Sequence, residues 1–425
     1  MILMKVNNLL HQIIQICHNK LYEYSFLCQH RVKPCHFTRN RKFGFVDTIL
    51  FMTSGIKNTL QSGLNYYLDM KNRQNETYTK QAFSKGRQRI KYSALKELSD
   101  TVINEFYKQA QTKTFLGYHL LAIDGSKYNL PITDKLKKEF GVQITGGAEQ
   151  PQALGSCMYD IQNGMIIDAH FDGCRSNERI HAAEMIKNLN SDLITNPVYI
   201  MDRGYPSGVL LELITKLNQH YIVRCDKTFL EGIEWNGEDT IVEHRFKSIK
   251  LPLRFRLITI TLNNGEDEYL ITNLFDKKIT LVEFSELYHL RWDIETKFSD
   301  LKVKMQIENF TGNTPISIYQ DFFATLYLAN LAGVLAFEYR DEIESIHNTP
   351  ENKLTYKLNI NMTISALKQN VIKLLSCPSP QDSAAILTNI AQRLQGCVVP
   401  VRPGRSEERK RKHIQSKFPQ NGKLP

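Results

Sequence analysis

The sequence predicts an α/β fold, in which helices flank a mixed β-sheet and a helical region precedes it. Two apolar strand-like runs, HLLAIDG at 119–125 and PVYIMDRGYPS at 197–207, each end at an aspartate. A hairpin pattern around residues 163–164 and an amphipathic helix pattern at 176–189 lie between them. The composition, 42% apolar and 23% charged, is typical of a folded protein.

The first 110 residues show helical patterning with polar breaks. The stretch YTKQAFSKGRQRIKYSALKEL at 78–98 interleaves apolar residues with Lys and Arg, as a small helical DNA-binding domain does. We therefore predict a helical N-terminal DNA-binding region over 1–110, with Lys80, Arg87 and Arg89 as candidate DNA contacts.

The next segments predict a sheet. The run ending at Asp124 and a glycine has the form of a buried strand. Residues 152–173 predict two strands joined at Asn163-Gly164, because Asn-Gly favours the left-handed backbone of a tight turn. A helix capped by Ser176 or Asn177 follows.

A second buried strand then ends at Asp202, and a helix (207–218) and a strand (220–225) come after it. The order strand, hairpin, helix, strand, helix, strand is the order of the ribonuclease-H-like fold. In that topology the first strand and the strand after the helix are neighbours. We therefore expect Asp124 and Asp202 at adjacent strand ends, in a first core part spanning 111–225.

Residues 226–280 interrupt this core. The stretch 254–275 alternates and turns at Asn264-Gly265, which predicts an inserted antiparallel β subdomain. The second part of the core, 281–340, carries the helix YHLRWDIETKFSDLK at 288–302. A C-terminal helical segment and a basic tail complete the chain over 341–425.

Four polar residues of that helix fall on one stripe. At about 100° per residue, Arg291, Glu295 and Lys302 lie within about 60° of Tyr288, at the border of the apolar face. An ordinary amphipathic helix gives the same pattern, and Arg291 with Glu295 is then only an i,i+4 ion pair.

Asp124, Asp202 and Glu295 together predict a carboxylate cluster. Close carboxylates repel one another unless positive charge lies between them, and Mg²⁺ prefers a few carboxylates plus water and phosphate oxygens. Two such ions can activate a nucleophile and stabilise the leaving oxygen of a phosphodiester. The alternative is that both aspartates only cap strands.

The charge distribution predicts a polyanionic partner. The net charge is +10, with eight Lys or Arg against one acid over 71–96 and eight against two over 402–425. Nucleic acid is the commonest such partner, although solvated surface or a disordered tail is the alternative for each segment.

The remaining composition indicates a reducing compartment and no membrane. The eight cysteines have no framework spacing, and polar residues interrupt the apolar opening too often for a secretory signal. The apolar run 322–337 contains Asn330 and is too short to span a bilayer, so it predicts a buried helix.

The motifs resemble those of the DDE transposases of the insertion-sequence-four family. DG follows the first apolar run, DRGY follows the second, and Tyr288, Arg291, Glu295 and Lys302 match the signature Y-x2-R-x3-E-x6-K without a gap. The resemblance implies a ribonuclease-H-like core with a β insertion, and cut-and-paste transposition of DNA.

The resemblance also implies roles for individual residues. Asp124, Asp202 and Glu295 would be the catalytic and metal-binding triad for two Mg²⁺ ions, with Mn²⁺ as a substitute. Tyr288, Arg291 and Lys302 would contact transposon-end DNA. Glu178, which lies near the core in the sequence, is a candidate for a supporting role.

As an expectation, the enzyme binds the terminal inverted repeats of its element, cleaves the ends and joins the 3′-OH ends to target DNA. It would act as a homodimer in a synaptic complex in the bacterial cytoplasm, associated with the nucleoid when bound to DNA. Two alternatives stay open: an inactive, domesticated DNA-binding protein, and a ribonuclease-H-like nuclease without strand transfer.

Overall fold

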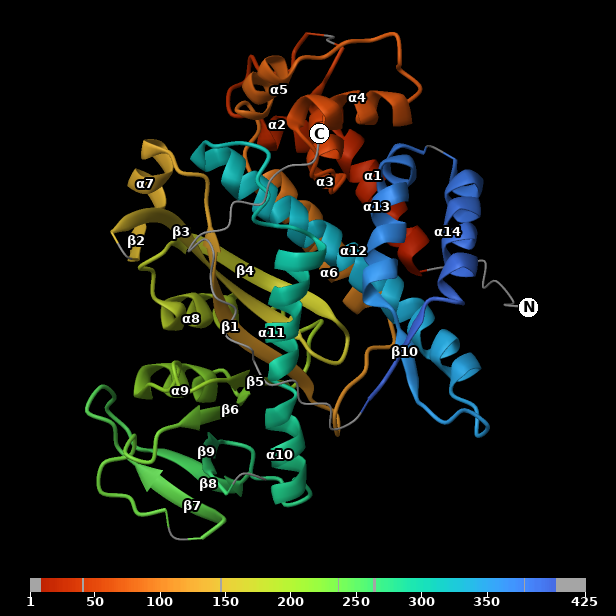
Figure 1. The fold of residues 1–425 in the computed structure, drawn as a ribbon. Coiled ribbons are helices and arrows are strands. Elements are labelled where there is room, and N and C mark those ends of the chain that lie inside the picture. Colours follow the sequence, from red (N-terminus) through yellow and green to blue (C-terminus); the bar gives the residue numbers. More distant parts are fainter. Residues whose placement is uncertain are drawn as a thin grey trace. The chain divides into compact units, whose positions relative to one another are not determined.

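A computed structural model describes residues 9–39, 42–145, 147–235, 237–262, 265–377 and 379–402. The chain forms two compact units, one built mainly of strands and one mainly of helices (Figure 1). The sheet unit comprises Gln111–Lys127 and Leu154–Ser299, and the helical unit comprises Met1–Ala110, Tyr128–Ala153 and Asp300–Pro425.

The sheet unit contains most of one mixed β-sheet. Its elements are β1 (His119–Asn129), β3 (Ala148–Asp160), β4 (Met165–Gly173), α8 (Glu178–Asn188), β5 (Pro197–Met201), α9 (Gly208–Lys216), β6 (His220–Cys225), β7 (Asp239–His244), β8 (Leu253–Thr261), β9 (Asp267–Thr272), α10 (Leu281–His289) and α11 (Trp292–Ser299). The strand order is β3-β1-β5-β6-β9-β8-β7, and β4 pairs with β3. The β1–β5 and β5–β6 pairs are parallel.

The predicted strands of the core are present. Residues Leu120–Ile123 of β1 and all of β5 are buried, which explains their continuous apolar runs. The predicted hairpin connects β3 to β4 at the expected place, and Gly164 adopts the left-handed backbone there (φ 76°). One boundary differs: β1 does not end at Asp124 but continues to Asn129, so Asp124 lies within a strand.

The region 226–280 contains three antiparallel strands, β7, β8 and β9. They continue the same sheet instead of forming a separate one, because β9 pairs with β6 in antiparallel orientation. Gly265 has the predicted left-handed backbone (φ 82°), whereas its partner in the predicted turn, Asn264, lies outside the described residues.

The helical unit contains most of the helices. They are α1 (Leu9–Tyr22), α2 (Tyr24–His30), α3 (Phe45–Thr53), α4 (Leu60–Met70), α5 (Lys80–Arg87), α6 (Ser93–Gln109), α7 (Asp134–Phe140), a π-helical turn (Asp300–Lys304), α12 (Pro315–His347), α13 (Ile360–Ser376) and α14 (Pro380–Leu394). Two small strand pairs complete it: β2 (Val142–Thr145) with the start of β3, and β10 (Tyr356–Leu358) with β11 (Val398–Pro400).

Helix α12 forms the core of the helical unit, as predicted for its apolar run. Thr314 and Ser317 form a capping box at its start, Pro315 occupies the first turn, and the helix packs against α6. Asn330 is fully buried, and its Nδ2 donates to Ser99 Oγ at 3.1 Å. Helix α12 is long and apolar enough to cross a membrane, but 78% of its most apolar stretch is buried inside the protein.

The basic stretch 78–98 is helical, as predicted: it contains α5 and the first residues of α6. Thr79 caps α5 by accepting a hydrogen bond from the backbone N–H of Ala82. Of the second basic segment, only residue 402 belongs to the described part of the chain.

Candidate active site

Asp124 and Asp202 lie side by side in the sheet unit. In the parallel β1–β5 pair Ile123 is opposite Met201, so the two aspartates follow at the same level of strands about 4.8 Å apart. Each carboxylate accepts a hydrogen bond from the next backbone N–H: Asp124 from Gly125 at 2.9 Å and Asp202 from Arg203 at 2.7 Å. The structure therefore brings the two predicted aspartates together.

Arg291 connects Glu295 to this pair. Its Nη2 donates to Glu295 Oε1 at 3.0 Å, and its Nη1 lies 3.9 Å from Asp124 Oδ2. The hydroxyl of Tyr288 donates to Asp202 Oδ1 at 3.4 Å, a long hydrogen bond. Side chains of the segment 288–295 therefore reach both strands that carry the aspartates.

The segment is not the regular helix that the sequence predicts. Helix α10 ends at His289 and α11 begins at Trp292, and the N–H of Arg291 bonds to the carbonyl of Tyr288, three residues earlier. Tyr288 and Arg291 are each only 3% exposed, so the prediction of a half-exposed stripe is wrong for them. The predicted stripe assumes about 100° per residue along one continuous helix. The break between α10 and α11 changes the direction of the side chains, so that assumption does not hold here.

The local electrostatics show an excess of negative charge. Burial raises the pKa of Asp124 to about 6; the Gly125 N–H and Arg291 oppose this rise, whereas Glu178 and Glu295 add to it. Burial alone would lower the pKa of Arg291, but the neighbouring Tyr288, Asp202 and Glu295 raise it. One guanidinium therefore faces several acidic groups.

Glu178, at the start of α8, is a fourth carboxylate of this group. A Cβ atom added to Gly125 would lie 2.7 Å from Cδ of Glu178, so the glycine next to Asp124 is needed for the glutamate to approach. The buried Tyr205 hydroxyl donates to Glu178 Oε2 at 3.0 Å. The DG and DRGY motifs thus each contribute one contact to Glu178, which the sequence alone did not link to them.

These residues fit a divalent cation. Asp124, Asp202, Glu295 and Glu178 against Arg291 leave a formal excess of three negative charges (four minus one). The donors are carboxylate oxygens, which hard cations such as Mg²⁺ prefer. The pKa of Asp124 is raised chiefly by burial, and a cation bound beside it would favour the ionised carboxylate.

A second group that can hold a metal ion lies elsewhere in the sheet unit. His170, Asp172 and His181 place one donor atom each within 4.8 Å of one another. His181 is held by Asp172 at 3.1 Å and by Ser156 Oγ at 2.9 Å. Imidazole nitrogens suit transition metals more than Mg²⁺, so this group is chemically distinct from the carboxylates.

Lys302, the last residue of the signature, belongs to the helical unit. It lies in the π-helical turn, and its Nζ lies 4.8 Å from the centre of the Tyr128 ring. Burial lowers its pKa, and Glu308 opposes that shift. Its predicted contact with DNA stays a prediction.

The prediction that Arg87 binds DNA is wrong. Arg87 is 1% exposed, and its guanidinium donates to Gln320, Thr311 and the carbonyl of Ser317, and forms a 2.6 Å ion pair with Asp321. It faces α12 and not solvent. In contrast, Lys80 is exposed and Arg89 is half-buried, so both stay candidates for DNA contacts.

Comparisons with known proteins assign the chain to a family. The family described as transposase DDE domain matches residues 116–331, about half of the chain, and this range includes all three predicted triad residues. The chain belongs to the DDE transposase family. It is 23% identical over 355 residues to the transposase InsG for insertion sequence element IS4 of Escherichia coli (strain K12), covering 80% of this chain and 77% of that protein. The predicted resemblance to the insertion-sequence-four transposases is thereby confirmed.

Two further similarities are more limited. A putative transposase, y4zB, of Sinorhizobium fredii is 32% identical over 87 residues, covering 20% of this chain and 24% of that protein. A cryo-EM structure described as the piggyBac transposase synaptic complex with hairpin DNA aligns with a TM-score of 0.46 and 11% identity, covering 94% of this chain and 88% of that chain. From its family, the protein is a DNA transposase whose cleavage activity uses divalent metal ions.

Proposed function

We propose that this transposase binds the terminal inverted repeats of its own insertion sequence, cleaves the DNA ends and joins their 3′-OH groups to target DNA. The observation that carries the proposal is the grouping of three carboxylates around one guanidinium. Asp124 and Asp202 are on adjacent parallel strands, and Arg291 lies close to Asp124 while donating to Glu295. Such a group is suited to metal-dependent phosphodiester chemistry.

We further propose that the core is ribonuclease-H-like. The strand order β4-β3-β1-β5-β6, with β1 parallel to β5 and β5 parallel to β6, supports this assignment. Strands β7, β8 and β9 would then be the inserted part between 226 and 280. The predicted domain divisions at 110, 225, 280 and 340 are kept as part of this proposal.

In the proposed reaction Asp124, Asp202 and Glu295 hold two Mg²⁺ ions, for which Mn²⁺ can substitute. When bound, the ions supply an activated water or 3′-hydroxyl nucleophile and stabilise the leaving oxygen. Glu178 adds negative charge beside Asp124 and is held in place by Tyr205.

Arg291 would bind the phosphate next to the cleaved bond. Its buried Nε has no hydrogen-bond partner among the described residues, so the guanidinium is not fully paired. For Tyr288, the buried ring and the approach of its hydroxyl to Asp202 support a positioning role in place of the predicted DNA contact.

The proposed partners are the two ends of the element and the target DNA, with a homodimer in the synaptic complex. Lys302, Lys80 and Arg89 would contribute phosphate contacts, and the protein would act in the bacterial cytoplasm, at the nucleoid when bound to DNA. No contact with a membrane is part of the proposal.

The test is cleavage of a short duplex that carries the element's own end, with and without Mg²⁺. Cleavage only with the metal, followed by joining of the 3′ end to a target plasmid, is the expected result. Cleavage without joining would support the nuclease alternative, and binding without cleavage under any metal condition would support the inactive DNA-binding alternative.

A further inference from the structure

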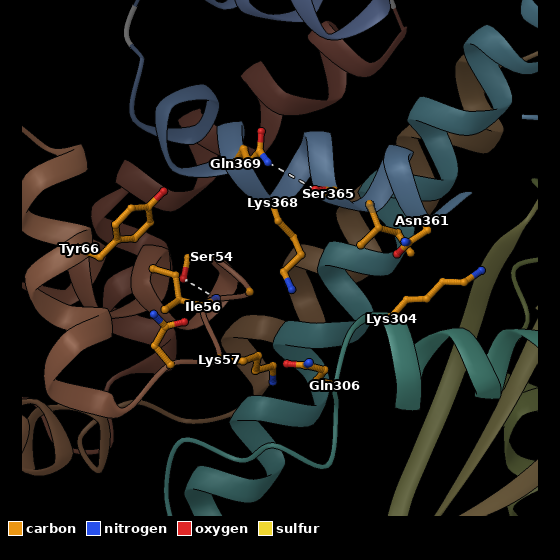
Figure 2. Close-up of a pocket in the computed structure, with 13 residues that line it drawn as sticks. Ser54, Ile56, Lys57, Tyr66, Lys304, Gln306, Asn361, Ser365, Lys368 and Gln369 are labelled. Atoms are coloured by element: carbon orange, nitrogen blue, oxygen red, sulfur yellow. Dashed lines mark hydrogen bonds between the residues drawn. The ribbon is translucent and has the colours of Figure 1, made fainter. Parts of the chain in front are cut away.

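A cavity of about 440 Å³ lies within the helical unit, and none of the candidate active-site residues lines it (Figure 2). Its walls come from the segment after α3, from the end of the π-helical turn and from α13, with Tyr66 of α4 at one side. A volume in this range suits a ligand the size of a nucleotide unit.

Lysines dominate the charge of this cavity. Lys57, Lys304 and Lys368 each come from a different wall, and none of the lining residues is acidic. Lys304 pairs with Asp300 at 2.6 Å, and Asp321, which pairs with Arg87 at 2.6 Å, also interacts electrostatically with Lys57, so two of the three lysines have an acidic neighbour outside the lining. The cavity therefore has an excess of positive charge.

Lys368 has the least compensated charge of the three. Within the described ranges it has no hydrogen-bond or ion-pair partner, and burial lowers its pKa. Figure 2 shows its side chain extending from α13 into the middle of the cavity, toward the tip of Lys57. A partly buried ammonium without a partner is unfavourable unless an anion approaches it.

The fold holds Lys368 in this place. Gly55 has a left-handed backbone (φ 68°), and a Cβ atom there would lie 2.8 Å from Cε of Lys368 and 2.7 Å from Cδ2 of Leu328. The lysine stem therefore depends on the absence of a side chain at Gly55. Gln306, which also lines the cavity, has φ 53°, an uncommon backbone conformation for a residue with a side chain.

We propose that this cavity binds a phosphate of the DNA backbone. Lys368 and Lys57 supply the charge, and Ser365, Asn361 and Gln369 on the same wall supply hydrogen-bond donors. The proposal rests on the proposed function, because a transposase that binds two ends and a target needs DNA contacts beyond its catalytic carboxylates.

The test measures binding of the full-length protein to a mixed-sequence duplex over a range of salt concentrations. Lys368→Gln should lower the slope of log K against log salt by about 0.9, and Lys57→Gln with Lys368→Gln by about twice that. The matched control is Lys373→Gln, an exposed lysine on the same helix that does not line the cavity, and it should leave the slope unchanged.

An unchanged slope for both cavity variants, with wild-type melting temperatures, would overturn the proposal. If Lys368→Gln lowers the melting temperature, Lys57→Gln alone is the deciding variant. Stabilisation of the wild type by ATP or inorganic phosphate that is lost in Lys368→Gln, with no change in the DNA slope, would assign the cavity to a small anion and also overturn it.

Failure of the cavity proposal and failure of the proposed function give different experimental results. Metal-dependent cleavage of the element's end by the wild type tests that function, and it can succeed while the cavity variants bind DNA normally. Conversely, a reduced slope in the cavity variants of a protein that does not cleave would support the DNA site and refute only the catalytic proposal.

Discussion

Two buried arginines, Arg87 and Arg291, have different surroundings. The difference distinguishes an arginine that stabilises the fold from one that belongs to the candidate active site. Arg87 in the helical unit is 1% exposed, and its Nε and both Nη atoms have partners, the closest being Asp321 at 2.6 Å. Arg291 in the sheet unit is 3% exposed, but it has one hydrogen bond of 3.0 Å, a 3.9 Å approach to Asp124 and an Nε without a described partner.

The difference lies in how fully each charge is compensated. Arg87 and Asp321 compensate each other, and Asp321 also accepts from the N–H and hydroxyl of Thr311. Arg291 faces more negative charge than it can neutralise, and its buried Nε has no partner within the described ranges. A buried charge with a complete set of partners stabilises one conformation, whereas an incomplete set leaves room for a metal ion or a substrate phosphate.

The largest expected effect is at the carboxylates near Arg291. Asp124→Ala, Asp202→Ala or Glu295→Ala should each abolish cleavage of end DNA, because each removes a metal ligand, and should leave binding largely intact, because affinity comes mainly from basic contacts. Cleavage and filter binding on the same duplex measure both. Asp293→Ala, on an exposed position of the same helix as Glu295, is the control. Near-normal cleavage by one triad variant removes that residue from the triad.

Arg87→Ala should cause the largest loss of stability. Removing one partner of a buried ion pair costs about 3–5 kcal/mol, because the other charge is left buried and unpaired. Denaturant unfolding measures this, and Arg87→Ala combined with Asp321→Ala should recover part of the loss. A variant with wild-type stability and a weaker salt dependence of DNA binding would show that Arg87 contacts DNA after all.

Glu338, a carboxylate of the helical unit, tests whether a buried group whose charge is not neutralised by a partner costs stability. It accepts from the N–H groups of Leu9 and Leu10, and burial raises its pKa to about 7. Since the folded pKa exceeds that of the unfolded chain, its contribution to stability is complete below about pH 4.5 and is lost as the pH rises through about 7.

The unfolding free energy of the wild type should therefore fall relative to Glu338→Gln by up to about 3 kcal/mol between these pH values. Parallel denaturant titrations of the two proteins measure the difference. A constant difference across this range would mean that Glu338 does not titrate there.

Arg291→Ala should slow cleavage of bound DNA without changing its pH profile, because arginine stays protonated and cannot act as a base. One lost charge-assisted phosphate contact costs about 1.5–3 kcal/mol, and Arg291→Lys should recover only part, since lysine cannot make the paired contact. Single-turnover cleavage of pre-bound duplex over a range of pH measures both. Wild-type rates in the two variants would reduce Arg291 to an ion-pair partner of Glu295.

The smallest effect per residue is expected in the basic segment beside Arg87. Lys80, Lys85 and Lys91 are exposed, and replacing all three by Gln should lower the salt slope of DNA binding by about three. Arg87 is excluded from this set by its burial. A slope equal to that of the wild type would mean that the three lysines face solvent in the complex.

The sequence by itself determined the two buried strands with their aspartates, the hairpin at Gly164 and the buried helix α12. These features depend on apolar runs, turn residues and periodicity, which are local properties of the chain. The family signature also singled out Glu295 as the third carboxylate, which stays a prediction, and the parallel pairing of β1 and β5 follows from the order of the elements.

Only the tertiary structure decided which charged side chains are buried and what they contact. Arg87 pairs with Asp321, 234 residues later, and Gly125 makes room for Glu178, in both cases through contacts that no local pattern contains. A lysine or arginine on an amphipathic helix has the same sequence signature whether it faces solvent or a second helix. Its partners are set by long-range packing, which here fixed Arg87, left Arg291 incompletely paired and placed Lys368 over Gly55.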